Sequence, residues 1–331
     1  MPSPDAKTRP HAPRRMAAAL TAAGALITAA GCTAVPAAAP VAPPGSDIVV
    51  AAVPATGATG LYIAEDHGFF SQAGLHVTID SAFSAASTIT GLLKGNIDVT
   101  LGQWTTAFSL EAKGTPLRVL AAGNAGGPGL EEIVTRSDSP ITAVSQLKRA
   151  TIAVNVPNGL SQDMAEGVLA ADGISGSQVQ WKPLPFPEMG AAVANGQVAA
   201  AFMVEPYVSE AEEHYGVTIL ADPDQGATQD LPITGYFTTR KWFDSHRAAA
   251  QAFVGALEEG ERIAARDRAA VEKALVRHLG LSPAIVAVMS LGTFPLGVDP
   301  VQLGRVGDLM QTHGQLPGTV NVATIVAALT K

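Results

Sequence analysis

Short apolar segments rich in β-branched residues alternate with segments of helical periodicity from Ile48 to about residue 240. Pro54 ends the first apolar run, and Gly95 follows a helical segment at 86–94, as a residue just past a helix end commonly does. Further strands are predicted at 76–79, 97–101, 117–121, 133–135, 151–154, 179–181, 198–203 and 217–220. Such alternation builds largely parallel sheets with helices on both faces, so we predict an α/β fold.

The pattern changes after Arg240, where Ala, Glu, Arg and Leu dominate. Helices are predicted at 245–279, 282–290, 300–312 and 322–330, and Pro300 suits a first helical turn. We expect this helical part to return to the first α/β region. Because 331 residues exceed the size at which one hydrophobic core usually stops growing, two lobes are predicted.

The amino end has the pattern of an export signal. Lys7, Arg9, Arg14 and Arg15 precede a charge-free run from Met16 to Ala30. As a helix this run would reach only about 22 Å, less than the ~30 Å hydrocarbon core of a membrane. We therefore predict a cleaved signal peptide at 1–31, exported by the general secretory or the twin-arginine route.

Cys32 is the only cysteine of the chain, so it cannot form a disulfide within it. The small residues before it resemble the lipobox of bacterial lipoproteins, whose cysteine is acylated and becomes the mature amino terminus. We predict lipidation of Cys32 and anchoring to the outer face of the cell membrane, with an incidental cysteine as the alternative. Residues 32–46 are rich in Ala and Pro and are predicted to be an extended tether.

Charge and motifs exclude several functions. The net charge is −8, whereas nucleic-acid binding needs clustered Lys and Arg, so no nucleic-acid partner is predicted. The seven histidines lack metal-binding spacing, and the chain contains no G-x-S-x-G nucleophile motif. We predict a monomer that is not an enzyme and needs no cofactor or metal.

A series of motifs resembles the nitrate/sulfonate/taurine-type substrate-binding proteins, a family related to binders of thiamine-precursor pyrimidines. The motifs are Tyr62–Phe70 with Ala73–Val77, Gly95–Val99, Leu147–Val154, Pro185–Met189, and Gly196–Ala201 followed by Glu205-Pro206. Arg149 replaces a usual glycine, and Ala199 stands where the family often has aspartate, so the comparison is weaker near these two residues.

The resemblance implies a two-lobed periplasmic-binding-protein clamp of type II. It would have two hinge crossovers, near 132–136 and 234–240. Lobe one would comprise 47–132 and 240–331, and lobe two 133–239. The family's function would make this chain the solute-binding lipoprotein of an ABC importer, with a permease and an ATPase as membrane partners. A ligand-sensing subunit is the alternative.

Ligands of open α/β sheets bind outside the carboxyl ends of the strands. We therefore predict ligand contacts from the segments that follow strands: Thr56, Tyr62, Ser84, Ala85, Ser87, Gln103, Trp104 and Asn124 in lobe one, and Asn158, Ser161 and Glu205 in lobe two. Ser84 to Ser87 could bind an anion through helix-start N–H groups, or act only as a helix cap. Trp104 would stack on a ligand or lie in the core.

Glu205 follows a buried strand, and a buried carboxylate needs a partner. That partner would be the ligand or a protein group across the hinge. The strand-end loops hold no Lys or Arg, which disfavours nitrate. We favour a sulfonate- or taurine-like ligand, with a neutral heteroaromatic that donates to Glu205 as the alternative.

Overall fold

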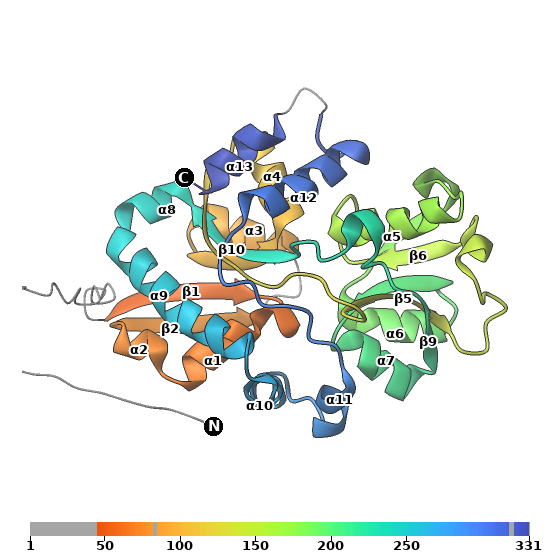
Figure 1. Cartoon of the computed structure of the whole chain (residues 1–331), viewed down its shortest axis with the longest axis horizontal. Helices are drawn as coiled ribbons and strands as arrows, with labels where there is room; N and C mark the ends of the chain where they lie inside the picture. The colour runs from red at the N-terminus through yellow and green to blue at the C-terminus, as the bar shows by residue number, and fades with distance from the viewer. Residues whose placement is uncertain (1–44, 82–84, 318–320, 331) are drawn as a thin grey trace, which may run out of the picture. The chain divides into compact units, whose positions relative to one another are not determined.

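The computed structural model describes residues 45–81, 85–317 and 321–330. In this part the strands form two five-stranded sheets, which confirms the α/β prediction (Figure 1). The first sheet has the order β2-β1-β3-β10-β4, with β1 Ser46–Ala52, β2 Leu75–Ser81, β3 Val99–Gln103, β4 Leu117–Ala122 and β10 Thr234–Thr239. The second has the order β7-β6-β8-β5-β9, with β5 Glu131–Arg136, β6 Thr151–Val154, β7 Gln180–Pro183, β8 Ala200–Val204 and β9 Val217–Ala221.

Each sheet contains one strand that runs against its neighbours. β10 is antiparallel to β3 and β4, and β5 is antiparallel to β8 and β9, whereas β1 and β6 pair in parallel with both of their neighbours. Thr234 pairs with Gln103, and Glu131 pairs with Val204. The first residues of β10 and β5 therefore lie at the edges where the neighbouring parallel strands end.

The links between the sheets lie before the predicted crossovers. β5 and β10 each pair along their length inside one sheet, so residues 123–130 and 222–233 join the two sheets. Ile133 and Val134 are fully buried, which fixes β5 in the core of the second sheet. Below, lobe one denotes the elements at 46–122 and 234–330, and lobe two those at 131–221.

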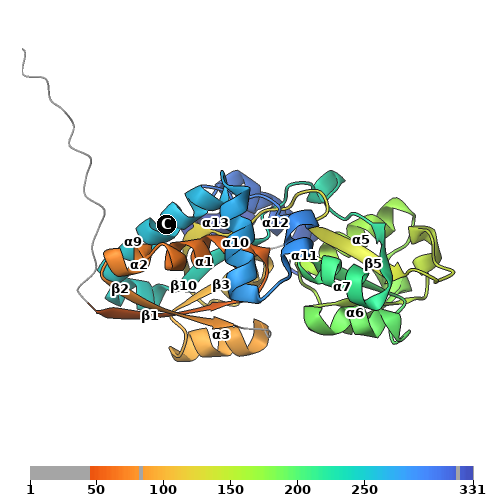
Figure 2. The ribbon, with the colours of Figure 1, turned by 90° about the horizontal axis from the view of Figure 1, so that it is seen from below.

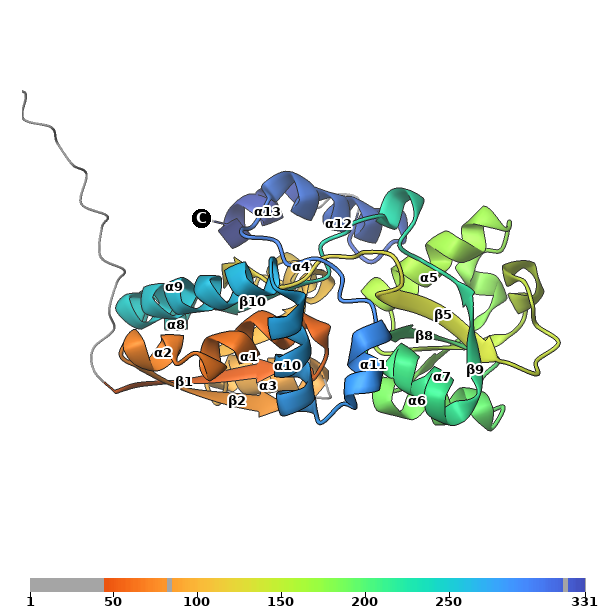
Figure 3. The same ribbon diagram turned by 60° about the horizontal axis from the view of Figure 1, so that its bottom comes forward.

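Helices cover both faces of the first sheet. Helices α1 Thr59–Asp66, α2 Phe69–Gln72 and α9 Arg247–Ala264 lie on one face, and α3 Ala85–Lys94 lies on the other (Figure 2). Successive side chains of β1 point to opposite faces of the sheet. Val50 belongs to the hydrophobic core that contains α1 and α9, and Ala51 belongs to the core on the opposite face. Helix α9 runs beside α1 (Figure 3) at very close range, because a Cβ on Gly260 would lie 2.1 Å from the carbonyl oxygen of Gly60.

The carboxyl-terminal region adds the remaining helices of lobe one. They are α8 Arg240–Ser245, α10 Arg268–Leu279, α11 Pro283–Val288, α12 Pro300–Thr312 and α13 Val322–Thr330, with the last two against α4 Trp104–Ala112. The single helix predicted at 245–279 is wrong. Asp267 begins a new helix there, because its side chain accepts from the backbone N–H of Ala270 at 3.1 Å.

Lobe two carries helices α5 Leu160–Ala171, α6 Phe186–Ala194 and α7 Tyr207–Tyr215. Short 3-10 turns complete the described part: η1 Thr56–Ala58, η2 Val144–Leu147, η3 Gly176–Gln178 and η4 Gly226–Thr228. None of the helices described is long and apolar enough to cross a membrane. The predicted signal peptide, Cys32 and nearly all of the tether lie outside the described residues.

Candidate ligand-binding site

Two polar residues meet at the edge of the first sheet where β1, β3 and β4 end. The backbone N–H of Asn124 donates to Thr234 Oγ1 at 3.1 Å, and that hydroxyl donates back to Asn124 Oδ1. A Cβ added to Gly57 would lie 2.7 Å from Asn124 Oδ1, so this side chain faces the turn η1. The structure thus brings η1, which contains the predicted residue Thr56, beside the predicted residue Asn124, and both residues are buried.

Gln103 ends β3, and Trp104 begins α4. Trp104 is 1 % exposed and contacts the neighbouring strand so closely that a Cβ on Gly235 would lie 2.2 Å from its ring. Gln103 Oε1 and Trp104 Nε1 are buried without a hydrogen-bond partner among the described residues. Trp104 also borders a cavity of about 220 Å³ together with Asn124. It is therefore a core residue that borders a small cavity.

Helix α3 begins at Ala85, so the serine-rich run leads into a helix as predicted. Ser87 is exposed in its first turn, and Ser84 lies outside the described residues. The turn follows β2, which places its N–H groups at a strand end, where an anion would find donors and the positive end of the helix dipole.

Tyr62 has a different environment from the other predicted residues. It is 3 % exposed and belongs to the core of lobe one. Its ring stacks on His278 of α10, with centroids 4.5 Å apart. Burial raises the pKa of its hydroxyl to about 12, so this group stays neutral at physiological pH. Tyr62 therefore joins α1 to α10.

In lobe two the loop between β6 and α5 is held by its own side chains. Ser161 donates from Oγ to Asn155 Oδ1 at 2.7 Å. Asn158 adopts a left-handed conformation with φ 52°, and its backbone N–H donates to Gln162 Oε1 at 2.9 Å. Ser161 is buried and engaged, whereas Asn158 faces open space.

That space is a cavity of about 730 Å³ bordered by both lobes. Lobe one contributes hydroxyl groups of α4 from Thr105, Thr106 and Ser109, together with the segment 313–317. Lobe two contributes the loop 156–159 that contains Asn158. Asn158 is thus the predicted residue that lies on a cavity shared by the lobes, and the hydroxyls of α4 were not predicted.

Glu205 is partnered by protein groups. Its carboxylate accepts from the backbone N–H of Ser209 at 3.1 Å and from the Ser209 hydroxyl at 2.8 Å. Burial raises its pKa to about 7, although hydrogen bonds from Ser209 and the backbone of Ser290 oppose the rise. Ser209 belongs to lobe two, as Glu205 does, whereas Ser290 follows α11 in lobe one. Of the two predicted kinds of partner, the structure therefore shows protein groups, one of which comes from the other lobe.

Sequence reasoning missed Tyr207, which directly follows Glu205-Pro206. Its hydroxyl donates to the carbonyl oxygen of Pro54 in lobe one at 2.9 Å. Its ring stacks on Phe186, with centroids 5.8 Å apart. A tyrosine immediately after a strand end was the available signal, but its distant partner was not visible in the sequence.

A second missed feature is a set of acids that lies with the predicted residue Glu205 at the edge of the second sheet. Glu131 and Glu132 open β5, Glu205 follows β8, and Asp222 and Asp224 follow β9. Burial, and then repulsion from Asp224 and Asp222, raises the pKa of Glu131 well above its usual value. Burial likewise raises the pKa of Glu132 to about 8. Burial therefore favours the protonated form of Glu131, Glu132 and Glu205, and Glu132 keeps its proton at neutral pH.

Basic groups are absent from the strand-end loops of both lobes. Residues 53–58, 102–104, 123–130, 155–159 and 204–206 contain no Lys or Arg. Helix amino ends, hydroxyls and amides are consequently the donors that these loops offer. No group of three or more His, Cys, Asp or Glu residues in the described part of the chain is arranged to hold a metal ion.

The two sheets are linked twice, and each contains one antiparallel strand that the chain enters directly from the other lobe. This arrangement is the periplasmic-binding-protein fold. The alkanesulfonate-binding protein SsuA of Xanthomonas axonopodis pv. citri, solved with MOPS, has the same fold at a TM-score of 0.71 and 22 % identity, covering 86 % of this chain and 99 % of that one. The nitrate-binding protein NrtA of Synechocystis PCC 6803 matches at a TM-score of 0.74 and 18 % identity, covering 88 % and 87 %.

The chain belongs to the NMT1-like family, whose pattern matches residues 41–278. Among curated proteins it is similar to YtlA of Bacillus subtilis strain 168, with 24 % identity over 206 residues. YtlA is described as a binding protein on inference. That match spans 61 % of this chain and 61 % of YtlA. The predicted relationship to sulfonate- and nitrate-type binding proteins is confirmed at the level of family and fold.

Proposed function

We propose that this protein is an extracytoplasmic solute-binding lipoprotein of an ABC importer. It captures a small organic molecule by hinge closure and delivers it to a membrane permease and its ATPase. The observation that carries this proposal is the cavity of about 730 Å³ that α4 of lobe one and the Asn158 loop of lobe two line together. A ligand that contacts both lobes stabilises the closed arrangement over the open one. The role is binding and not catalysis, in keeping with the solved relatives, which are named as binding proteins.

A sulfonate- or taurine-like ligand fits the donors of this site best. Helices α4 and α5 begin beside this cavity, and helix starts bind anions without a basic side chain. Helix α3 begins outside the cavity lining, after strand β2. The hydroxyls of Thr105, Thr106 and Ser109 add donors on the lobe-one side of the cavity. The alkanesulfonate-binding relative with the same fold lends the class further support.

A neutral heteroaromatic ligand is the second candidate. The unpartnered Gln103 Oε1 and Trp104 Nε1 favour it, because a ring with one donor and one acceptor would satisfy both. The engagement of Glu205 by Ser209 speaks against the carboxylate as its acceptor.

The location follows from the amino end. Cys32, acylated after removal of residues 1–31, would anchor the chain to the outer face of the cell membrane, and 32–46 would hold the folded part away from it. The protein would work as a monomer whose partners are the ligand, the lipid anchor and the membrane subunits.

Native mass spectrometry of the freshly purified protein, followed by calorimetry, tests the proposal. We expect a retained small organic molecule, and micromolar or tighter binding within a panel of alkanesulfonates, taurine and MOPS. Binding of pyrimidines alone would replace the favoured ligand class, and binding of neither panel with no retained molecule would contradict a solute-binding role. Copurification with a permease and an ATPase supports the importer, whereas copurification with a membrane receptor supports a ligand sensor.

A further inference from the structure

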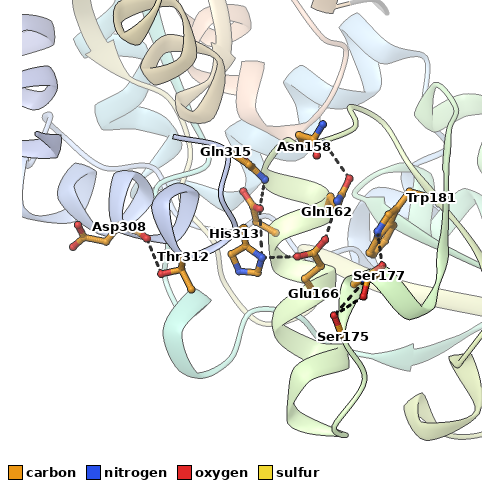
Figure 4. Close-up of polar contacts among 12 residues, drawn as sticks. Asn158, Gln162, Glu166, Ser175, Ser177, Trp181, Asp308, Thr312, His313 and Gln315 are labelled. Carbon is orange, nitrogen blue, oxygen red and sulfur yellow. Dashed lines mark hydrogen bonds and ion pairs between the residues drawn. The ribbon is translucent and has the colours of Figure 1, made fainter. Parts of the chain in front are cut away.

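Two side chains from the turn after α12 meet helix α5 of lobe two (Figure 4). His313 Nδ1 lies 2.5 Å from Glu166 Oε2, and Gln315 Nε2 donates to Asp163 Oδ1. The partners are 147 and 152 residues apart in sequence. The turn belongs to lobe one, because α12 and α13 contact α4, so these bonds join the two lobes.

The same network reaches the loop that borders the shared cavity. Glu166 Oε1 accepts from Gln162 Nε2 at 2.8 Å, and Gln162 Oε1 accepts from the backbone N–H of Asn158 at 2.9 Å (Figure 4). One chain of hydrogen bonds therefore runs from Asn158 to His313. Asn158 is held in a left-handed conformation that few residues other than glycine adopt, so this support is structurally significant.

The pair is shielded from solvent. The side chains of His313 and Glu166 are 15 % and 18 % exposed, and that of Asp163 is fully buried. Screening by water and salt is weaker for such a pair than for an exposed one. Loss of either partner would leave a poorly solvated charge, so the interaction is more than a surface ion pair.

Other charged groups near His313 come from several elements. Asp163 lies 3.9 Å away on α5. On one side of His313, Lys113, the residue after α4, borders the same cavity. A second cavity, on the other side of His313, is bordered by Asp172, Asp222, Arg305 and Asp308. The nearest charges are thus the two carboxylates of α5, which favour a protonated imidazole.

The protonation states point in one direction. The hydrogen bond to Glu166 raises the pKa of His313 above its usual 6.5. Burial alone would raise the pKa of Glu166, but hydrogen bonds from His313 and Gln162 hold it below its usual 4.5. Burial raises the pKa of Asp163 to about 7. At a pH between the lowered pKa of Glu166 and the raised pKa of His313, His313 is a cation beside an ionised Glu166.

We propose that His313 and Glu166 form a latch between the lobes, which holds α5 and the Asn158 loop against lobe one without a ligand. The latch strengthens the closed clamp and presets the loop on the lobe-two side of the cavity. It is fully formed at mildly acidic pH, below the usual histidine pKa of 6.5. It weakens as the pH rises and His313 loses its proton, because two buried carboxylates then face a neutral ring.

Hydrogen exchange and small-angle X-ray scattering of the ligand-free, full-length protein test the latch. His313→Gln and Glu166→Gln should each speed the exchange of α5 amides roughly tenfold at about pH 6 and enlarge the radius of gyration. His278→Gln is the matched control. His278 Nε2 lies 2.9 Å from Asp66 Oδ1, so this is a histidine–acid pair inside lobe one that is shielded from solvent to a similar degree. This control should leave both readouts for α5 unchanged.

A pH comparison separates a latch from ordinary packing. After correction for intrinsic exchange rates, α5 of the wild type should exchange faster at about pH 9 than at about pH 6. This difference should be clearly smaller in His313→Gln, where Asp163 and the acids of the second sheet still titrate. Unchanged exchange in both His313→Gln and Glu166→Gln, an equal effect of His278→Gln, or a pH effect as large in His313→Gln as in the wild type would each overturn the latch. These experiments use no ligand, so a result that overturns the latch leaves the proposed solute binding untouched. Likewise, a failure to bind the ligand panels would not overturn the latch.

Discussion

The hydroxyl of Tyr207, the first residue of α7 in lobe two, donates to the carbonyl oxygen of Pro54, 153 residues earlier in lobe one, at 2.9 Å. Tyr207 is 7 % exposed, so the bond lies in a water-poor region where it is worth more than an exposed one. It ties the start of α7 to the loop that leads into η1 beside Asn124. One hydroxyl group of lobe two is consequently bonded to a strand-end loop of lobe one.

Removal of that hydroxyl should weaken ligand binding. Tyr207→Phe keeps the stacking on Phe186 and loses one hydrogen bond, which costs about 0.5–1.5 kcal/mol of closure. Calorimetry with the best sulfonate of the panel should show an affinity reduced by that amount. Tyr215→Phe, on the exposed end of the same helix, is the control and should bind as the wild type. Equal affinity of both variants would mean that the Pro54 contact does not contribute to closure.

The ligand head group can be tested at the start of α3. If an anionic group binds there, Ser87→Ala should cost about 0.5–1.5 kcal/mol in binding free energy, the usual value of one hydrogen bond. Glu205→Gln should change sulfonate affinity little, because Ser209 already satisfies the carboxylate. A heteroaromatic ligand that donates to Glu205 predicts the reverse, with a loss of about 1.5–3 kcal/mol in Glu205→Gln and none in Ser87→Ala. Titrating both variants against both panels distinguishes these outcomes.

Local signals predicted much of the fold. Asp299 accepts from the N–H groups of Val301 and Gln302, and with Pro300 it starts α12 at the expected residue. The alternation of apolar runs likewise predicted β1 to β9 within a few residues, whereas the segment of β10 was predicted only as a hinge crossover. The break at Asp267 was missed because helix-forming residues continue on both sides, and only the capping bond of this aspartate separates α9 from α10.

The site was less predictable because distant neighbours decide the role of each residue. Trp104 lies in the core because the partner strand presents Gly235, which leaves room for the indole. Glu205 looks like a ligand group until Ser209 and the backbone of Ser290 are placed beside it. The strand-end rule predicted Asn124 and Asn158, each of which borders a cavity. Contacts such as Tyr207 with Pro54 could not be predicted, because the two residues are far apart in the sequence.

The proposed membrane anchor is Cys32, which lies outside the described part of the chain. Because Cys32 is the only cysteine and follows a signal-like run, Cys32→Ala should move the protein from the membrane fraction to the soluble exported fraction. Cell fractionation with immunoblotting measures the change, and incorporation of a labelled fatty acid should disappear in the variant. A wild type that is already soluble after export would show that Cys32 is an incidental residue of an ordinary signal peptide.

The acids at the edge of the second sheet predict a loss of stability at alkaline pH. Burial raises the pKa of Glu132 from 4.5 to about 8, so the folded chain keeps a proton that the unfolded chain releases above about 4.5. Folding therefore binds a proton in this window, and the free energy of unfolding falls as the pH rises from about 4.5 through about 8. We expect the midpoint of thermal unfolding to drop by at least a few degrees between about pH 6 and about pH 9.

Glu132→Gln removes this proton without removing the side-chain volume, so the fall in the unfolding midpoint over the same pH range should become shallower. The matched control is Glu65→Gln, because Glu65 is exposed on α1 and its replacement should leave the wild-type slope intact. Part of the slope should remain in Glu132→Gln, since Glu131 and Glu205 also have raised pKa values. Differential scanning calorimetry at several pH values measures all three proteins. Parallel curves for the wild type and Glu132→Gln would mean that Glu132 ionises in the folded protein as freely as it does in the unfolded chain.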